Sequence, residues 1–256
     1  MIIRKSAREL DQMASAGAVV ADTLSLLGEH VKPGATTGEL DRIADDFIRS
    51  KGGEPTFKGY QGPYPYPASI CTSPNEVVVH GIPDGYELAE GDILSVDVGV
   101  TLDGFVADSA YTFAVGEIDL QAERLLEVCN AALYAGIQQA RPGGKLTDIS
   151  YAVQRATEEA GFSVVRSLVG HGVGRDMHED PQIPNYGEPG RGPTLTPGMT
   201  LAIEPMITAG GHEIVVRDDQ WTIATADGSL SAHFEHTVAV TDEGPRILTA
   251  APVRAA

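Results

Sequence analysis

The sequence contains one pattern twice, and this repeat constrains the fold more than any other feature. Lys32-Pro33-Gly34 is matched by Arg141-Pro142-Gly143, and the helix-ending Gly52 is matched by Gly161, each at an offset of 109 residues. A Pro-Gly pair alone would carry little weight, because it is a common helix terminator. The two copies agree over four features in order: a helix, the Pro-Gly pair, a second helix and a glycine that ends it. This agreement favours an internal duplication.

Each copy begins with two predicted helices. Apolar residues recur at steps of three and four over residues 7–30 and about 121–139, which predicts an amphipathic helix before each Pro-Gly pair. A shorter helix follows in each copy. In the first copy we place its cap at Thr37 and its end at the glycine pair 52–53.

Strand-like sequence follows each helix pair. The segments are 69–80, 92–100 and 104–115 in the first copy, and 163–169, 199–208, 213–217, 221–225 and 231–241 in the second. Two halves of a helix pair plus antiparallel strands predict an α+β fold with a pseudo-two-fold axis. We expect one domain, residues 1–256, with halves of approximately 1–118 and 119–256. Paired halves commonly hold a site between their sheets, and we expect the Pro-rich segments 59–67 and 180–197 to form loops over it.

Two aspartates interrupt the hydrophobic segment SVDVGVTLDGFVADSA, residues 95–110. Burying an unpaired carboxylate is costly, so Asp97 and Asp108 either lie on a solvated face or meet a positive charge. Asp103-Gly104 is a strong signal for a two-residue hairpin turn, which would place Asp97 opposite Ala110. Both carboxylates would then point to the same face of the sheet, whereas a three-residue loop without a bulge would separate them.

The second copy carries two further acids in apolar segments, Glu204 in TLAIEPMIT and Glu235 in SAHFEHTVAV. Four acids in four hydrophobic strands, two in each half, argue against four unrelated solvated sites. Adjacent carboxylates cannot all stay ionised without positive charge between them. His171, flanked by glycines, offers a neutral nitrogen ligand beside them. One histidine and four carboxylates suit two divalent cations, a centre that activates water for hydrolysis.

The composition excludes several function classes. Acidic residues outnumber basic ones 36 to 18, which argues against a general surface for binding nucleic acid. There is no signal peptide and no apolar run long enough to span a membrane, so we expect a soluble, cytoplasmic protein. Cys71 and Cys129 could form one disulfide, but two free thiols are favoured. The HExxH, GxSxG and P-loop motifs are absent from the sequence.

Several motifs resemble those of type I methionine aminopeptidases, in order and over nearly the whole chain. They are GYQG, CTSPNEVVVHGIPDG, SVDVGVTLDGFVADSA, GHGVGRDMHEDPQIPNYG, AIEPM and WTIATADGSLSAHFEHTVAVTDEG. The resemblance implies the pita-bread fold, whose internal two-fold agrees with the repeat. It also implies hydrolysis of the first peptide bond of nascent proteins that begin with methionine, with a small second residue preferred, as part of protein maturation.

The resemblance further implies a cofactor of two divalent metal ions, which could be Co, Mn, Fe, Zn or Ni. The implied ligands are Asp97, Asp108, His171, Glu204 and Glu235. Asp108 and Glu235 would bridge the ions, with Asp97 on one ion and His171 and Glu204 on the other. A monovalent cation would lie near Asn75, Val77 and Ser231.

Catalytic and substrate-binding residues are implied in the same way. His80 would bind the scissile amide, His178 would stabilise the oxyanion, and Glu204 would shuttle a proton. The methionine pocket would use Tyr60, Tyr66, Cys71, Met177 and Trp221, a polarisable lining that suits a thioether. Outside these motifs, the histidines would be read as surface residues and the tyrosines as loop packing. Three features depart from the family pattern: Met177 where many relatives have Phe, Gln61 where His is frequent, and a longer loop at 62–69.

Two alternatives remain open at this point. A proline-specific aminopeptidase or prolidase-like dipeptidase of the same fold would use the same five ligands. Those enzymes usually carry an additional N-terminal domain, for which the residues before Asp97 leave no room. A non-catalytic pita-bread binding protein would typically have lost metal ligands, whereas all five are present here. We also expect a monomer that contacts the ribosome transiently.

Overall fold

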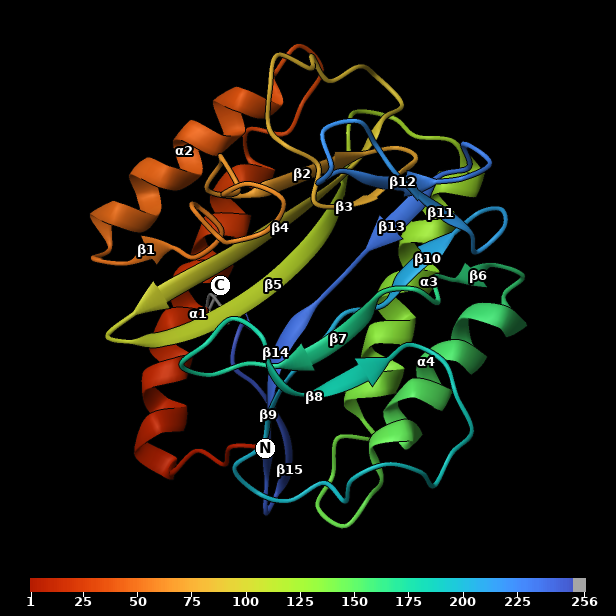
Figure 1. Cartoon of the computed structure of the whole chain (residues 1–256). Helices are drawn as coiled ribbons and strands as arrows, with labels where there is room; N and C mark the ends of the chain where they lie inside the picture. The colour runs from red at the N-terminus through yellow and green to blue at the C-terminus, as the bar shows by residue number, and fades with distance from the viewer. Residues whose placement is uncertain (251–256) are drawn as a thin grey trace, which may run out of the picture.

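The structure is a computed structural model, and it describes residues 1–250. Its helices form two pairs, red and orange on one side of Figure 1 and green on the other. They are α1 (Ala7–Gly28), α2 (Thr37–Ser50), α3 (Leu120–Ile137) and α4 (Leu146–Glu159). None of the helices in residues 1–250 is long and apolar enough to cross a membrane. The two predicted helix pairs are confirmed.

The repeat in the sequence is also visible in the backbone. Helix α4 (Leu146–Glu159) begins and ends 109 residues after α2 (Thr37–Ser50). Gly34 and Gly143 both adopt left-handed backbone angles, with φ of 87° and 85°, and glycine adopts this region without steric cost. The backbone N–H groups that precede α2 and α4 donate to the Glu39 and Asp148 carboxylates, respectively. The two halves therefore start their second helices in the same way.

The strands form four sheets between and above the helices. The first sheet contains β1 (Glu54–Pro55), β4 (Ile93–Leu102), β2 (Cys71–Pro74) and β5 (Phe105–Ala114), and a small sheet contains β11 (Ile214–Val216), β12 (Ile223–Thr225) and β3 (Val77–Val79). In the second half, β13 (Ser231–His233), β10 (Met206–Thr208) and β6 (Ser163–Val164) form one sheet. The largest sheet has the order β15 (Gly244–Ile247), β14 (His236–Thr241), β9 (Thr200–Ile203), β7 (Val169–Gly172) and β8 (Glu179–Pro184).

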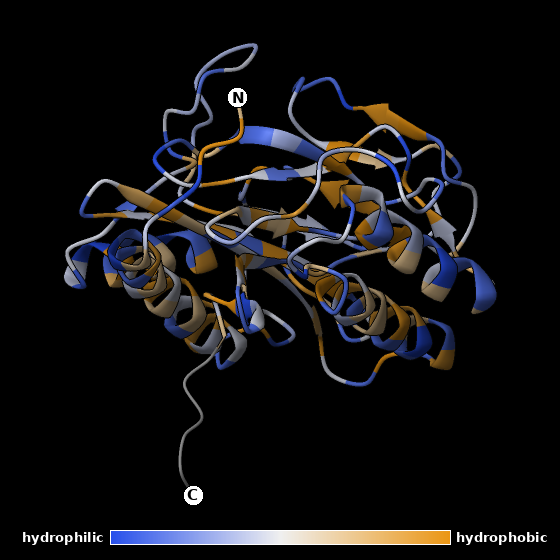
Figure 2. Ribbon diagram, turned by 90° about the horizontal axis from the view of Figure 1, so that it is seen from below, coloured by the Kyte–Doolittle hydropathy of each residue, from blue (hydrophilic) through white to orange (hydrophobic). Residues whose placement is uncertain are grey.

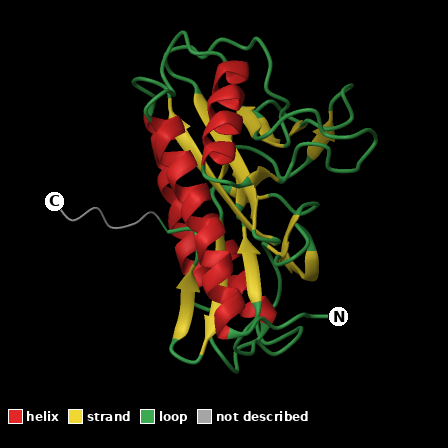
Figure 3. Ribbon diagram, turned by 90° about the vertical axis from the view of Figure 1, so that its left-hand side faces the viewer, coloured by secondary structure: helices red, strands yellow, loops and turns green. Residues whose placement is uncertain are grey.

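The helices gather on one side of the strands. Figures 2 and 3, from two perpendicular directions, both show the helices against one face of the β layer. One buried apolar cluster joins α1 and α2 to β4 and includes Leu27, Leu40 and Val98. A second joins α3 and α4 to β9 and β14 and includes Leu133 and Ile149. Burial of apolar surface thus fixes each helix pair on its own strands and leaves the other face of these strands available for a site.

The hairpin β4–β5 has the register that its turn predicts. Asp103 and Gly104 both have positive φ, 50° and 76°, as a two-residue hairpin turn of the primed type requires. Asp97 pairs with Ala110, and Gly99 pairs with Asp108. Since side chains alternate along a strand, the two carboxylates point to the same face. This prediction is confirmed.

Several local predictions were wrong. The cap of α2 is Thr36, whose hydroxyl accepts from the Glu39 N–H at 3.2 Å, rather than Thr37. Glu204 and Glu235 do not lie inside continuous strands but in the gaps between β9 and β10 and between β13 and β14. At the first gap, Pro205 has no N–H to donate to a neighbouring strand. At the second gap, the Glu235 N–H donates to the Ala110 carbonyl at 2.9 Å instead of pairing within its own sheet.

The segments around His171 also differ from the prediction. His171 lies in strand β7, beyond the end of the predicted strand 163–169, and the predicted loop 180–197 begins within strand β8. These two strands pair with each other, with a register shift between His171 and Gly172. The predicted strand 69–80 is divided into β2 and β3, because Asn75 adopts a left-handed turn conformation with φ 54°.

Candidate metal centre and active site

The predicted site residues meet at a small cavity of about 100 Å³. It lies on the side of β5 away from α1, because Asp108 faces it while the neighbouring Ser109 faces the helices. The cavity is lined by Phe57 together with all twelve predicted site residues: Tyr60, Tyr66, Cys71, His80, Asp97, Asp108, His171, Met177, His178, Glu204, Trp221 and Glu235. Residues from both copies of the repeat therefore converge on one point.

In residues 1–250, three of the four carboxylates that line this cavity have a buried oxygen without a partner. Asp97 Oδ1, Asp108 Oδ1 and Glu235 Oε1 are buried and accept no hydrogen bond within residues 1–250. Donor atoms of Asp108, His171 and Glu235 lie within 4.8 Å of one another. Buried polar atoms are nearly always paired, so these oxygens indicate a missing positive partner. The residues present therefore fit a divalent cation.

The electrostatics of the cluster lead to the same conclusion. Burial, opposed in part by His233, raises the pKa of Asp97 to about 6, and burial raises that of Glu204 to about 8. The pKa of Asp108 is raised well above its ordinary value by burial and by the charges of Asp97 and Glu204. The pKa of Glu235 is also raised well above its ordinary value, mainly by burial and next by the charge of Asp108. Cations between the carboxylates would relieve both the desolvation and the repulsion.

His171 presents an unprotonated nitrogen to the acids. Its Nδ1 lies 2.8 Å from the Gly172 carbonyl oxygen, which can only accept, so Nδ1 carries the proton. The other nitrogen, Nε2, lies 3.5 Å from Glu204 Oε1 and 3.9 Å from Asp108 Oδ2. Burial lowers the pKa of His171 to about 4, so the ring is neutral at physiological pH. This tautomer is the one that a metal ligand needs.

We assign the opposite tautomer to His178. The Tyr60 hydroxyl lies 2.6 Å from His178 Nδ1. Burial, followed by the charge of Asp176, raises the pKa of Tyr60, so its hydroxyl stays protonated and is able to donate to this nitrogen. Burial lowers the pKa of His178. With the phenol as donor, Nδ1 of the neutral ring accepts and Nε2 carries the hydrogen, and this is the tautomer that we assign to His178.

His80 has an unusual backbone conformation. Its φ is 59°, in the left-handed region that residues with a side chain rarely adopt. Burial lowers the pKa of His80 to about 4, with smaller contributions from His233 and His178. Strained backbone of this kind is often found at functional sites, where the surrounding structure holds it in place.

The apolar part of the cavity is formed by aromatic and sulfur-containing side chains. Tyr66 contacts the edge of Trp221, with ring centroids 5.2 Å apart, and its hydroxyl donates to the Gly81 carbonyl at 2.9 Å. The Tyr66 hydroxyl is therefore occupied within the protein. The sulfur atoms come from the buried Cys71 and Met177. Phe57 completes the lining, and the sequence analysis missed it because it lies outside the recognised motifs.

The loop of residues 62–69 contributes to the wall of the same pocket through Tyr66. The Tyr64 hydroxyl donates to the Asp219 carbonyl at 3.0 Å, and its ring lies 6.2 Å from that of Trp221. Tyr66 nevertheless reaches the cavity. Tyr64 therefore adds an exposed aromatic ring beside Trp221.

His233 is a second residue that the sequence analysis missed. It is 2% exposed, and its Nε2 lies 3.6 Å from Glu204 Oε2. Burial lowers the pKa of His233, and the charge of Asp97 partly opposes this effect. The sequence could have indicated this residue, because His233 lies two positions before Glu235 in the predicted strand 231–241, and such residues share one face of a strand.

The three residues expected near a monovalent cation do not line the cavity. Two of them are in contact, since the Ser231 N–H donates to the Asn75 carbonyl oxygen at 2.8 Å. Val77 lies in β3, which pairs with β12 at Ala224. The structure thus places Asn75 next to Ser231.

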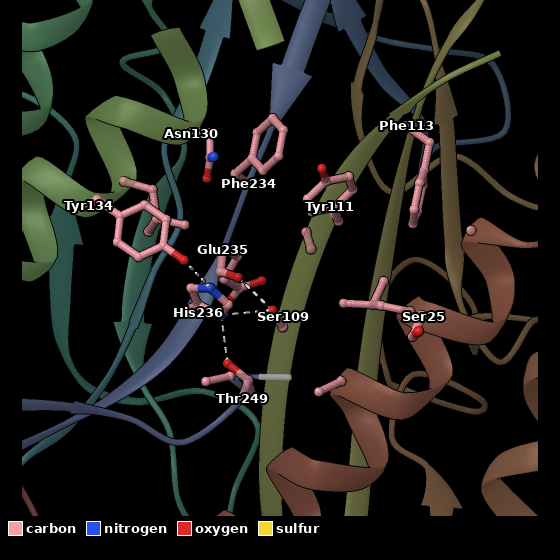
Figure 4. A pocket seen from close by; sticks show the side chains of 16 residues that line it. Ser25, Ser109, Tyr111, Phe113, Asn130, Tyr134, Phe234, Glu235, His236 and Thr249 are labelled. Carbon is pink, nitrogen blue, oxygen red and sulfur yellow. Dashed lines mark hydrogen bonds between the residues drawn. The ribbon is translucent and has the colours of Figure 1, made fainter. Parts of the chain in front are cut away.

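A larger cavity of about 620 Å³ lies between α1 and α3, on the opposite face of β5 (Figure 4). Ser25 of α1 and Tyr134 of α3 stand on either side of it, and His236 lies at its base beside Thr249. Of the predicted site residues only Glu235 lines it. The residues that were predicted to form the active site therefore line the smaller cavity and not the larger one.

Comparison with known proteins agrees with this geometry. Residues 11–242 match the family described as Metallopeptidase family M24. The chain is 53% identical to Methionine aminopeptidase 1 of Bacillus subtilis, over 97% of this chain and 99% of that protein. It superposes on the crystal structure of methionine aminopeptidase from Rickettsia prowazekii with a TM-score of 0.95 and 43% identity, covering 98% and 100% of the two chains.

A prolidase from Pyrococcus horikoshii is more distant. Its TM-score is 0.78 at 19% identity, and the match covers 99% of this chain but 65% of that one. The similarity to this prolidase therefore concerns the fold and carries no argument about activity. Family, relatives and structure agree on the predicted pita-bread fold, and the chain belongs to metallopeptidase family M24, within its methionine aminopeptidase branch.

Proposed function

We propose that this chain removes the N-terminal methionine from nascent proteins by metal-dependent hydrolysis, with preference for a small second residue. The observation that carries the proposal is the convergence of four carboxylates and His171 on one cavity whose other walls are aromatic and sulfur-containing side chains. Three of these carboxylates have a buried oxygen without a partner in residues 1–250. The names of the relatives agree with this reaction.

The metal centre would be held by residues from both halves of the chain. Membership of a metallopeptidase family implies divalent metal ions. We propose two ions, held by Asp97, Asp108, His171, Glu204 and Glu235, with Asp108 and Glu235 shared between them. Carboxylates and one imidazole accept Mn, Fe, Co, Ni or Zn with modest discrimination. When bound, such ions supply a Lewis acid for the scissile carbonyl and lower the pKa of water.

The remaining polar side chains would act on the peptide bond itself. His178 would donate its Nε2–H to the carbonyl oxygen as that oxygen gains negative charge, and its tautomer supports this role. His80 would hydrogen-bond to the scissile amide. Glu204 would take a proton from the attacking water and deliver it to the amide nitrogen. The carbon–nitrogen bond then breaks after the new carbon–oxygen bond has formed, and the products are free methionine and a shortened chain.

The apolar walls would select the methionine side chain. Cys71, Met177 and Trp221 are polarisable groups that suit a thioether, and Tyr60, Tyr66 and Phe57 add aromatic surface. The small volume of the cavity supports a single side chain as its occupant.

Four finer points belong to the same proposal. A monovalent cation would bind near Asn75, Val77 and Ser231, and the contact between Asn75 and Ser231 supports this placement. The protein would act in the cytoplasm, where nascent chains expose their first residue. It would work as a monomer and contact the ribosome transiently. Size-exclusion chromatography and co-sedimentation with ribosomes test the last two points.

The proposed function is tested with two peptide series and a divalent ion. The protein, stripped of metal and then given Mn²⁺, is expected to release methionine from Met-Ala-Ser and to leave Xaa-Pro peptides intact. Without metal, release should stop. Preference for the Xaa-Pro series would assign the chain to the proline-specific alternative, and the absence of any metal binding would favour a non-catalytic protein.

A further inference from the structure

His233 is a buried histidine that the proposed mechanism does not use. It ends strand β13 and pairs with Met206 of β10. Its side chain is almost fully buried, and its Nε2 has no hydrogen-bond partner within residues 1–250. An unpaired buried nitrogen is rare and calls for an explanation.

The backbone of His233 is firmly fixed. Its N–H donates to Thr112 Oγ1 at 3.0 Å, and the Thr112 hydroxyl donates to the His233 carbonyl oxygen at 2.7 Å. These two bonds tie the end of β13 to β5, the strand that carries Asp108. The ring of His233 therefore projects from a rigid frame rather than from a loop.

Nε2 of His233 faces one oxygen of Glu204. The distance from Nε2 to Oε2 is 3.6 Å, while the other oxygen, Oε1, lies 3.5 Å from His171 Nε2. The Glu204 carboxylate is thus placed between two imidazoles, with one oxygen toward each. A shift of a few tenths of an ångström would bring the Nε2–Oε2 distance within hydrogen-bond range.

We propose that His233 is a positioning residue of the metal centre, which donates its Nε2–H to Glu204 Oε2. This inference rests on the proposed function, because it assumes that Glu204 is a metal ligand. With Oε2 held by His233, Oε1 is directed toward the cation on the side of His171. Hydrogen bonds of this kind orient ligand carboxylates, and their loss typically weakens metal binding by about 10–100-fold.

His233 is assigned to the carboxylate rather than to the metal itself. Among the residues described, Nε2 of His171 lies within 4.0 Å of two carboxylates, those of Asp108 and Glu204, as a nitrogen that shares a cation with them would. Only Glu204 presents a carboxylate oxygen within 4.0 Å of His233 Nε2 in that part of the chain.

The experiment compares two substitutions at this position. His233→Phe keeps a ring of similar size but removes the donor, whereas His233→Gln keeps an N–H that can reach Glu204 Oε2. His212→Leu is the matched control, because His212 is an exposed histidine paired only with its neighbour Glu213. Mn²⁺ affinity is measured by calorimetry on metal-stripped protein at one pH, together with thermal unfolding and with kcat and KM for Met-Ala-Ser.

We expect His233→Phe to weaken Mn²⁺ binding by about 10–100-fold and to lower kcat more than it changes KM. His233→Gln should stay within about threefold of the unsubstituted protein, as should His212→Leu. Unchanged Mn²⁺ affinity in His233→Phe would overturn the inference, and so would a loss in His233→Gln as large as in His233→Phe. If His233→Phe does not fold, His233→Leu replaces it. Failure of the unsubstituted protein to bind Mn²⁺ would instead contradict the proposed function.

Discussion

The Lys5 ammonium group and the Glu179 carboxylate form an ion pair that is almost completely buried. Their side chains are 3% and 5% exposed. The other Glu179 oxygen accepts from the Arg175 N–H at 2.8 Å. Glu179 directly follows His178, so this pair fixes the N-terminal segment against the loop that carries the proposed oxyanion histidine.

Replacing Lys5 tests how much this pair contributes to stability. Lys5→Met leaves the Glu179 carboxylate buried without its counter-charge, and breaking such a pair costs about 3–5 kcal/mol. We expect a loss of this size in the free energy of unfolding, measured with denaturant. Adding Glu179→Gln to Lys5→Met should recover part of it. Arg155→Met, which breaks an exposed pair with Glu159, should cost less than about 1 kcal/mol; a loss equal to that of Lys5→Met would contradict the argument.

Asp108→Asn should separate metal binding from folding. The substitution removes a carboxylate that the proposed centre shares between two ions, so kcat should fall by at least about 100-fold. It also removes a buried carboxyl group whose ionisation is opposed by burial and by the neighbouring carboxylates, so the melting temperature of the metal-free protein should not decrease. Asp103→Asn in the same hairpin is the control, because an Asn-Gly turn is equally suitable there. Mn²⁺ should raise the melting temperature of that control but not of Asp108→Asn; an equal rise in both would show that Asp108 is not a ligand.

The stability of the metal-free protein should fall between pH 6.5 and 9. Burial raises the pKa of Glu204 from 4.5 to about 8, so the folded state binds its proton more tightly than the unfolded state does. The contribution of Glu204 to the free energy of unfolding is fully present below pH 4.5 and is lost as the pH rises through 8. Below pH 6.5 the buried His80 and His171, with pKa values lowered to about 4, oppose this trend.

The loss from Glu204 alone between pH 6.5 and 9 is about 2 kcal/mol. Denaturant unfolding in the presence of a chelator measures it, and Mn²⁺ should reduce it because cations favour the ionised carboxylates. Glu204→Gln should show a smaller fall. A metal-free stability that stays constant or rises over this pH range would contradict the raised pKa.

The features that could be predicted from sequence are those that local chemistry decides. The Asp103-Gly104 turn sets the register of β4 and β5, and the register places Asp97 and Asp108 on one face. The helix pairs follow from apolar periodicity and from glycines at fixed places in the repeat. The convergence of the acids from the second half followed from the repeat combined with the family motifs rather than from spacing alone.

The features that escaped prediction depend on contacts between distant segments. The strand break at Glu235 is set by a hydrogen bond across the two halves, from the Glu235 N–H to the Ala110 carbonyl. His233 reaches Glu204 because β13 pairs with β10, and no local pattern encodes that pairing. Phe57 reaches the cavity from outside the motifs, where it packs close to Gly99.

Tyr60→Phe tests whether the tautomer of His178 matters for turnover. Without the phenol, Nδ1 of His178 loses its donor, so the ring can place its hydrogen there and present a bare Nε2 to the substrate oxygen. We expect kcat for Met-Ala-Ser to fall by about 10-fold or more with little change in KM, because the lost bond acts as charge develops. Tyr64→Phe is the control, since its hydroxyl donates to Asp219 and not to a histidine. Equal kcat values for the two variants would show that Tyr60 serves only as pocket wall.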